Sequence, residues 1–259
     1  MAFKRTLNRH GWIPDLPDHR DKVYQVPNRF MRVVAPLPKS VDLRSKGPGM
    51  IFDQGDLGSC TANAIGAAVM FEQIAQGEKP VVPSRLFIYY NERVIENSVG
   101  SDAGAMIRDG IKSINKQGVA DEAVWPYVPS KFAVKPSLAA YQNAKKEMLL
   151  SYSSVSQNSY NPRHCLSAGY PFVFGFSVYE SFESDQVAQT GIVPMPGPDE
   201  SQLGGHAVIA VGYDDAKKMF LVRNSWGSGW GIGGHFWIPY DYLLNPDLAS
   251  DFWTLRRLS

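Results

Sequence analysis

The stretch DQGDLGSCTANAIGAAVMFE, residues 53–72, decides the fold of this chain. Its glycine-punctuated first half is typical of a loop. From Thr61 onward it is apolar nearly all round, which indicates a buried helix rather than a surface one. The helix is predicted to run to Gln76, with Gly77 as the residue that ends it. The loop therefore delivers a cysteine, Cys60, to the first turn of a central helix.

Cys60 stands where a reactive thiol is expected. Unpaired backbone N–H groups and the positive end of the helix dipole favour the thiolate there, so a lowered pKa is predicted for Cys60. Gln54 lies upstream, and the glycines between the two residues allow a loop that turns its amide toward the sulfur, as in an oxyanion hole. The alternative is an inert buried thiol with an amide that pins its own loop. This stretch alone does not choose between the two.

Two later stretches supply partners for a cysteine nucleophile. LGGHAVIAVGYDD, residues 203–215, places His206 at the start of an apolar run that favours a strand, and MFLVRNSWGSGWG, residues 219–231, places Asn224 at the end of another. A cysteine nucleophile needs a base, and the base needs an orienting acceptor. His235 stands in a similar apolar run, so position alone leaves open that His206 is a core histidine bonded to backbone.

With these motifs the chain resembles the papain-like cysteine peptidases of the papain family, C1. His206 follows Cys60 by 146 residues, which falls in the family's own spacing of about 130 to 150 residues, so the spacing is matched to the family rather than derived. Leu57 stands where the family usually carries a disulfide cysteine, and Thr61 where it usually has Trp or Tyr. The chain therefore looks like a divergent member that lacks the family disulfides. The resemblance is carried by Val41-Asp42-Leu43-Arg44, Gln54, Gly58-Ser59-Cys60, Gly204-Gly205-His206-Ala207 and Asn224-Ser225-Trp226-Gly227.

The resemblance implies an α+β fold of two lobes, a helical left lobe and a β-barrel-like right lobe, with the active site at their seam. Residues 1–40 are predicted to be an extended N-terminal segment, residues 41–130 the helical lobe with the nucleophile, and residues 131–259 the β-rich lobe with His and Asn. The N-terminal segment is either a structural wrap or a short prosegment. The wrap is favoured, because prosegments of this family are usually longer and helical.

Local patterns agree with this division. Ser84 is predicted to cap a second helix, SRLFIYYNERVIE, with Phe87, Tyr90 and Val94 on its core face. Isoleucines at helical spacing predict a third helix that Gly118 closes. A short helix over residues 162–168 is expected to carry Cys165. Strands are predicted over residues 152–155, 171–179, 207–213, 219–223, 235–238 and 251–255.

As a member of this family the chain is expected to hydrolyse peptide bonds through an acyl-thioester. The resemblance implies Cys60 as nucleophile, His206 as base, Asn224 as its orienting group and Gln54 as an oxyanion donor. Trp226 is expected to shield the hydrogen bond between His206 and Asn224 from water.

The same resemblance implies a substrate-binding edge ahead of the third helix. Gly104 and Ala105 take the positions of a glycine pair whose backbone pairs with an extended substrate. Met106 and Ile107 are candidate hydrophobic walls, which favours a hydrophobic side chain at the second residue before the scissile bond. The alternatives are a catalytically silent papain-like binding scaffold and a transamidase that passes the acyl group to an amine. Silent scaffolds usually lose Cys, His or Gln, and here all three are present.

Composition excludes several other classes. The 259 residues carry 26 Lys and Arg against 25 Asp and Glu, a net charge of +1, so a nucleic-acid footprint is not expected. No apolar run is long enough for a membrane span, and the start of the chain has no signal core. Two cysteines give no disulfide framework, which favours a soluble cytoplasmic protein, with secretion after removal of a leader as the alternative. Neither metal nor cofactor is expected. The expected partners are a peptide or protein substrate and a proteinaceous inhibitor.

Overall fold

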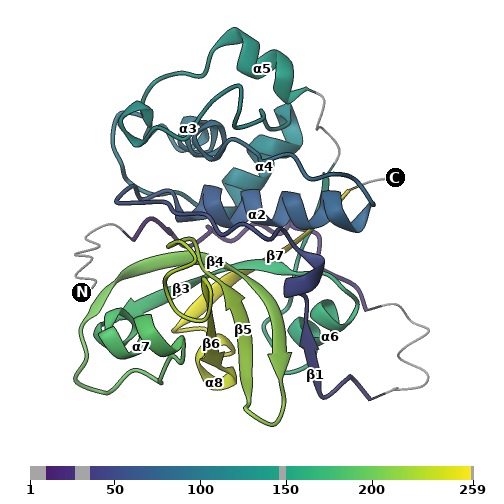
Figure 1. Cartoon of the computed structure of the whole chain (residues 1–259), viewed down its shortest axis with the longest axis vertical. Coiled ribbons are helices and arrows are strands. Elements are labelled where there is room, and N and C mark those ends of the chain that lie inside the picture. The colour runs from purple at the N-terminus through teal and green to yellow at the C-terminus, as the bar shows by residue number, and fades with distance from the viewer. Residues whose placement is uncertain (1–9, 27–35, 146–149, 258–259) are drawn as a thin grey trace.

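Two lobes are joined along one long helix in the computed structural model of the chain, which describes residues 10–26, 36–145 and 150–257. Helix α2, Cys60–Ala75, runs between a group of helices and a twisted sheet (Figure 1). The two-lobe α+β architecture implied by the family resemblance is confirmed. Residues 1–9 and 27–35 of the predicted N-terminal segment lie outside the described residues.

The helical lobe follows its sequence signals closely. α2 is buried from Cys60 to Gln73, as its all-round apolar pattern predicted, and Gly77 beyond it adopts a left-handed φ of 75°. Ser84 caps the next helix, where its hydroxyl accepts a hydrogen bond of 3.1 Å from the backbone N–H of Phe87. The other helices of this lobe are α3, Arg85–Ile95, α4, Ile107–Gln117, and α5, Leu138–Ala144.

The β-rich lobe is built on an antiparallel sheet with the strand order β2-β7-β3-β4-β5-β6, and β1 adds to β4. The predicted strands are all present, and β4 is longer than predicted at both ends. The strand β1 was not predicted; the family start motif at residues 41–44 falls on it and the turn after it. The strands are β1, Ser40–Asp42, β2, Leu150–Ser154, β3, Phe172–Tyr179, β4, Gln202–Asp214, β5, Met219–Arg223, β6, His235–Pro239, and β7, Ala249–Arg257.

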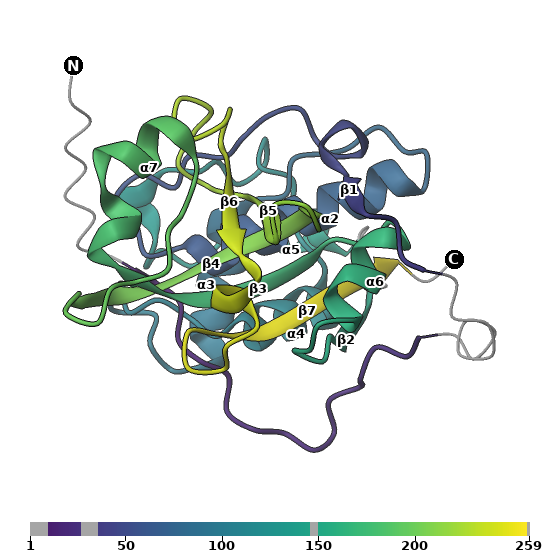
Figure 2. The same cartoon turned by 90° about the horizontal axis from the view of Figure 1, so that it is seen from below.

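Short helices flank the sheet. Figure 2 shows α6, Asn161–Ser167, and α7, Asp185–Thr190, at opposite ends of the β-rich lobe. α6 carries Cys165 as predicted. The remaining short elements are α8, Tyr240–Leu243, and the 3-10 turns η1, Arg44–Lys46, η2, Pro129–Lys131, and η3, Glu180–Glu183.

The predicted core face of α3 is wrong at its C-terminal end. Val94 is 46% exposed, whereas the neighbouring Arg93 is fully buried. The guanidinium of Arg93 donates to the carbonyls of Val99, Ser101 and Phe132 and so ties two loops to the helix. A buried, fully bonded arginine therefore takes the place that the apolar pattern assigned to valine.

Backbone hydrogen bonds connect the two lobes next to the start of α2. The backbone N–H of Gln54 donates to the carbonyl of Ser225 at 2.9 Å, and that of Gly227 donates to Phe52 at the same distance. The loop before Cys60 is thus fastened to the segment that follows β5. No helix in the described ranges is both long and apolar enough to cross a membrane.

Candidate active site

Cys60 begins α2 and is completely buried. The loop that leads to it is fixed from two sides. On one side the N–H of Gly58 donates to Asp102 Oδ1 at 3.1 Å. On the other, the hydroxyl of Tyr127 lies 2.6 Å from that of Ser59 and donates to the carbonyl of Gln54 at 2.9 Å. The thiol is therefore held on a rigid loop at the N-terminal end of a buried helix.

His206 lies on β4, next to Ala207, whose backbone acts to lower the pKa of the Cys60 thiol. The Nε2 atom of His206 lies 2.8 Å from Asn224 Oδ1, and this oxygen also accepts from the N–H of Ser225 at 2.8 Å. An amide oxygen can only accept, so Nε2 is the protonated nitrogen of the neutral ring. The other nitrogen, Nδ1, is unprotonated, and its lone pair can accept a proton from a thiol.

Trp226 covers the bond between His206 and Asn224. Its ring stacks on that of His206, with centroids 4.9 Å apart and an interplanar angle of 28°. Phe176 of β3 meets the imidazole edge-on at 5.8 Å. His206 is only 1% exposed. The bond to Asn224 lies in a dry aromatic setting, where a hydrogen bond is stronger than in water.

Gln54 is buried beside the same residues. Its Oε1 accepts from the hydroxyl of Ser225 at 2.7 Å, and its Nε2 donates to the carbonyl of Leu57 at 2.9 Å. These two bonds fix which end of the amide is the donor. One hydrogen of Nε2 is donated to the carbonyl of Leu57, and the second is available to donate a hydrogen bond to an oxyanion.

Burial is the main cause of the pKa shifts of Cys60 and His206. Burial raises the pKa of the Cys60 thiol to about 12, although the backbone amides of Ala207, Gly11 and Thr61 pull it down. Burial also lowers the pKa of His206 to about 3, against the opposing hydrogen bond to Asn224. The predicted lowering of the pKa of Cys60 is therefore wrong for this state, because removal of water outweighs the helix terminus. Both shifts favour a neutral thiol and a neutral imidazole at neutral pH.

The water is excluded by the chain's own N-terminal segment. Residues 10–13 lie along the predicted substrate-binding edge, where the N–H of Ile13 donates to the carbonyl of Ala105 at 3.0 Å and the N–H of Ala105 donates to that of Gly11 at 2.7 Å. Trp12 pairs in parallel with Ala105, and its N–H donates to the carbonyl of Gly205 at 3.0 Å. The segment spans the seam from the helical lobe to β4.

The four predicted substrate-binding residues lie in different settings. Gly104 has a φ of +78°, and a Cβ there would lie 2.2 Å from the carbonyl oxygen of Gly11, so only glycine admits the segment. Ala105 pairs with the extended backbone of that segment. Met106 is half-buried, and Ile107 is fully buried in the core as the first residue of α4. Of the two candidate walls, Ile107 is thus part of the helical core.

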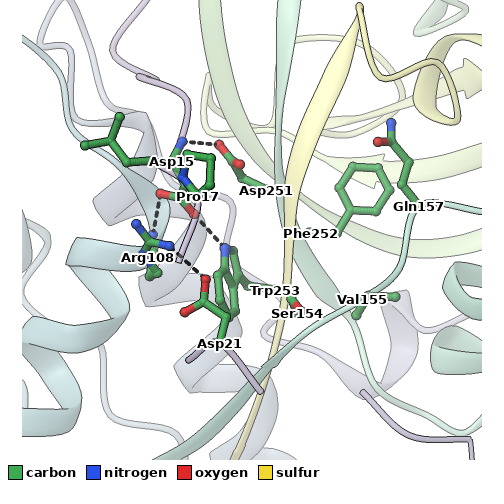
Figure 3. Close-up of a pocket in the computed structure, with 11 residues that line it drawn as sticks. Asp15, Pro17, Asp21, Arg108, Ser154, Val155, Gln157, Asp251, Phe252 and Trp253 are labelled. Carbon is green, nitrogen blue, oxygen red and sulfur yellow. Dashed lines mark hydrogen bonds and ion pairs between the residues drawn. The ribbon is translucent and has the colours of Figure 1, made fainter. Parts of the chain in front are cut away.

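The apolar character of Trp12 predicted that it anchors the N-terminal segment on the body, but sequence reasoning missed the aspartates that fix the segment. Trp12 Nε1 donates to Asp251 Oδ2 at 3.0 Å, and the N–H of Asp15 donates to the same oxygen at 2.8 Å. Asp15 in turn accepts from Trp253 Nε1 at 2.8 Å and from the N–H of Arg108 at 3.1 Å (Figure 3). Nothing in the sequence around Asp251 pointed to a partner at the other end of the chain.

The two departures from the family motif are both accommodated in the core. Leu57 is 4% exposed and packs as an apolar residue. Thr61 Oγ1 donates to Glu92 Oε1 at 2.7 Å, and burial raises the pKa of Glu92 well above its usual range. A Cβ on Gly110 would lie 2.4 Å from Glu92 Oε2, so this glycine makes room for the acid. Both cysteines are free, and no cluster of three or more metal-ligating side chains occurs within the described part of the chain.

Comparison with known proteins identifies the family of the chain. The family model described as papain family cysteine protease matches residues 37–246. An uncharacterized peptidase C1-like protein of Acanthamoeba polyphaga mimivirus is 50% identical over 276 residues, which is 98% of this chain and 89% of the relative. The solved structure of xylellain, a cysteine protease from Xylella fastidiosa, is 43% identical, with a TM-score of 0.91 and full coverage of both chains.

More distant relatives are longer than this chain. Ananain from Ananas comosus is 27% identical over 225 residues, and this chain spans 59% of its length. The family model covers most of the chain, and the mimivirus protein is well above the identity at which family membership is secure. The chain belongs to the papain family of cysteine proteases.

Proposed function

We propose that the chain is a cysteine peptidase in which Cys60 is the nucleophile and His206 the base. The observation that carries this proposal is the hydrogen bond of 2.8 Å between His206 Nε2 and Asn224 Oδ1, stacked under Trp226. It fixes the tautomer in which Nδ1 can accept a proton. Ala207, which follows His206 in β4, lowers the pKa of the Cys60 thiol, and this supports a place for the imidazole beside that thiol.

The reaction begins when His206 Nδ1 takes the proton of Cys60 and the thiolate attacks the scissile carbonyl. The backbone N–H of Cys60 and the second hydrogen of Gln54 Nε2 then hold the oxyanion. Loss of one such donor commonly costs about 3 kcal/mol in the activation barrier. His206 gives its proton to the leaving amine, and a water molecule, activated by the same ring, hydrolyses the thioester. Peptides or proteins in extended form are the substrates, and a proteinaceous inhibitor would occupy the same edge.

Residues 10–13 hold this peptidase closed. They occupy the edge at Ala105 that an extended substrate would use, and the backbone of Gly11 acts to lower the pKa of the Cys60 thiol. The segment also leaves the thiol without water, so that the charged pair cannot form. Of the two roles open for the N-terminal segment, these contacts favour the prosegment over the structural wrap.

Replacement of Asn224 by alanine is expected to lower kcat/KM by about tenfold, because the imidazolium loses a hydrogen bond worth about 1.5 kcal/mol or more to a charged group. The neutral ring would also be free to rotate. Steady-state cleavage of a fluorogenic peptide under reducing conditions measures this loss. Asn224→Asp restores an acceptor and should recover most of the rate. An unchanged rate in Asn224→Ala would remove Asn224 from the mechanism.

Closure by the N-terminal segment is expected to weaken as the pH rises from about 4 to 7. Burial and the neighbouring Asp251 raise the pKa of Asp15 from 3.8 to about 7, and burial also raises the pKa of Asp251. The docked state therefore keeps a proton that the released segment gives up above pH 4, so docking is strongest in acid and loses stability through this window. Arg108, which faces Asp15 and pairs with Asp21 at 2.7 Å, opposes but does not cancel the rise in the pKa of Asp15.

The rate at which a small thiol reagent labels Cys60, divided by the rate for Trp12→Ala at each pH, isolates this effect from titration of the thiol. The ratio should rise by about tenfold between pH 4 and 7, the change that one unit of pKa shift gives. In Asp15→Asn the rise should be largely lost. A ratio that falls with pH in the wild type would show that the two carboxylates do not control docking.

Product analysis tests the proposed reaction against its alternatives. The full chain is incubated with a peptide and an excess of a primary amine, and products are identified by mass. Two hydrolysis fragments are expected. Amide formed with the added amine would indicate a transamidase, and no change in a protein whose Cys60 also resists electrophiles would indicate a silent binding scaffold.

A further inference from the structure

A buried acid that the proposed reaction does not use lies close to the nucleophile. Thr61 Oγ1, in the first turn of α2, donates a hydrogen bond of 2.7 Å to Oε1 of Glu92 on α3, and both residues are completely buried. α3 and α4 pack against α2 on the side away from the sheet, so the acid lies inside the helical lobe (Figure 1). Because Thr61 follows Cys60 directly, Glu92 is bonded to the residue next to the nucleophile.

The surroundings of Glu92 favour its uncharged form. Its Oε2 has no hydrogen-bond partner among the described residues, and the adjacent guanidinium of Arg93 donates to loop carbonyls instead. Burial is the main reason why the pKa of Glu92 lies well above its usual range, and the acidic side chains of Glu96 on α3 and Asp109 on α4 add to the rise. The hydrogen bond from Thr61 and the charge of Arg93 oppose this rise in the pKa without cancelling it.

A buried acid without a full set of partners lowers the stability of the fold. Oε2 of Glu92 loses its hydration and gains no hydrogen bond in return. The acid also requires Gly110 in the middle of α4, where a Cβ would lie 2.4 Å from this oxygen, and glycine is unfavourable inside a helix. A leucine in place of Glu92 would avoid the unpaired oxygen. Departures of this kind from a well-packed core are expected at functional sites.

Side chains, rather than an ordinary cap, fix the first turn of α2. Ser59 occupies the N-cap position, but its side chain caps no backbone N–H, and its hydroxyl lies 2.6 Å from that of Tyr127. The bond between Thr61 and Glu92 holds the same turn from α3. Cys60 lies between these two attachments, and its N–H is the one that the proposed reaction uses for the oxyanion.

We propose that Glu92, acting through Thr61 as a neutral acid, is a positioning residue that fixes the N–H of Cys60 for the oxyanion. The inference rests on the proposed peptidase function. The neutral form is required, because a negative charge on Glu92 raises the pKa of the Cys60 thiol and so opposes the thiolate. Coupling between two groups is reciprocal, so the thiolate in turn favours protonated Glu92.

The test removes the bond in two ways in the full chain. Glu92→Gln keeps the length of the side chain and an oxygen that accepts from Thr61, but it cannot ionise. The double variant Thr61→Val with Glu92→Leu replaces both partners by apolar groups of similar size. Such a replacement is commonly neutral or favourable for stability, whereas removal of one partner alone is costly.

Four quantities are measured for each chain: the temperature of unfolding, kcat and KM for a fluorogenic peptide, and the rate at which iodoacetamide alkylates Cys60. Values of kcat are given per Cys60 that an epoxide inactivator labels, so unfolded molecules do not count. Alkylation by iodoacetamide forms no oxyanion and therefore reports the thiol alone. Thr61 and Glu92 bond to each other rather than to residues 10–13, so the closed fraction should be the same in every chain.

The double variant should unfold at the wild-type temperature or above it. Its kcat should fall about tenfold while KM changes less than about threefold, because the lost interaction serves the transition state. Alkylation by iodoacetamide should change less than about threefold, since thiol and imidazole stay in place. A residue that only holds the fold would give the opposite pattern, with a lower unfolding temperature and faster alkylation.

Glu92→Gln should restore kcat to within about threefold of the wild type, because its amide oxygen accepts the bond from Thr61. The ratio of wild-type to Glu92→Gln rates should stay constant through about pH 4 to 6, where an exposed glutamate loses its proton. The raised pKa keeps Glu92 protonated there. Any change in this ratio at higher pH should be a fall, since ionised Glu92 opposes the thiolate.

Thr254→Val is the matched control for the loss of a buried hydroxyl. Thr254 is a buried threonine of β7 in the other lobe, and its Oγ1 donates to the carbonyl of Pro171 at 3.0 Å. This variant should lose stability and keep the wild-type kcat per labelled Cys60.

Wild-type kcat in the double variant would overturn the positioning role, as would a loss of kcat that comes with a lower unfolding temperature and faster alkylation. A ratio of wild-type to Glu92→Gln rates that rises with pH would show that Glu92 works as an anion, which also overturns it. All three results would leave the peptidase proposal standing, because Cys60 would still have cleaved the peptide. If neither the wild type nor Trp12→Ala cleaves a peptide or takes up the epoxide, the peptidase proposal fails and the role of Glu92 falls with it.

Discussion

The Cys60→Ala variant is expected to lose at least about four orders of magnitude in kcat/KM for every peptide that the wild type cleaves, because removal of the nucleophile of a catalytic unit commonly costs a factor of about a million. Cys60 is completely buried at the start of α2, and its replacement by alanine removes the attacking atom together with only a small side-chain volume. The residual rate would come from the oxyanion donors and from binding. Fluorogenic cleavage under reducing conditions measures the loss.

Cys165 provides the matched control for this experiment. It is the other thiol of the chain, is equally buried, and lies on α6 in the β-rich lobe. Burial raises its pKa to about 12, as it does for Cys60. Cys165→Ala should keep near-normal kcat/KM and lose only some stability. Activity that survives in Cys60→Ala, or disappears in Cys165→Ala, would contradict the assignment of the nucleophile.

Replacement of Trp12 by alanine is expected to raise peptidase activity by up to about a hundredfold. Truncation of a buried Trp costs about 3 kcal/mol or more, and here the cost falls on the docked segment alone. A shift of this size in the equilibrium between closed and open forms corresponds to about two orders of magnitude. The rise ends when the open form dominates, so KM for the peptide should change less than kcat measured per total enzyme.

The other anchors of the segment limit the effect of this substitution. Arg108 still pairs with Asp21, and the hydroxyl of Tyr24 still bonds to His164 Nδ1 at 2.9 Å. Trp237→Ala is the matched control, since it removes a half-buried tryptophan from β6, away from residues 10–13. That variant should lose stability without any gain in rate. Activity of Trp12→Ala at or below the wild-type level would show that the segment does not close the cleft.

Local signals were sufficient for most of the fold. The apolar run after Thr61 predicted a buried α2, and Ser84 and Gly118 predicted the start of α3 and the end of α4, all of which are confirmed. These signals act within one or two turns of helix, so the sequence carries them directly. The burial of Arg93 in place of Val94 depended on loop carbonyls of Val99, Ser101 and Phe132, which no helical pattern describes.

The site was predictable only in part, because some of its contacts join residues that are distant in the sequence. The motifs around Cys60, His206 and Asn224 lie on short stretches whose residue types indicate their chemistry, and their roles remain proposals. The position of residues 10–13 depends on contacts between Trp12 and Asp251, which are separated by almost the whole chain. Their effect on the pKa of Cys60 follows from that docking and could not be read from the helix terminus alone.

The central claim is that Cys60 is the nucleophile of a peptidase and that residues 10–13 close the cleft in which it lies. The most direct measurement is the rate at which an epoxide inactivator labels the full chain, followed by intact mass and peptide mapping, for wild type, Trp12→Ala and Cys60→Ala. We expect a single label on Cys60, faster uptake in Trp12→Ala than in wild type, and none in Cys60→Ala. Equal rates in the first two, or a label that maps to Cys165, would contradict the claim.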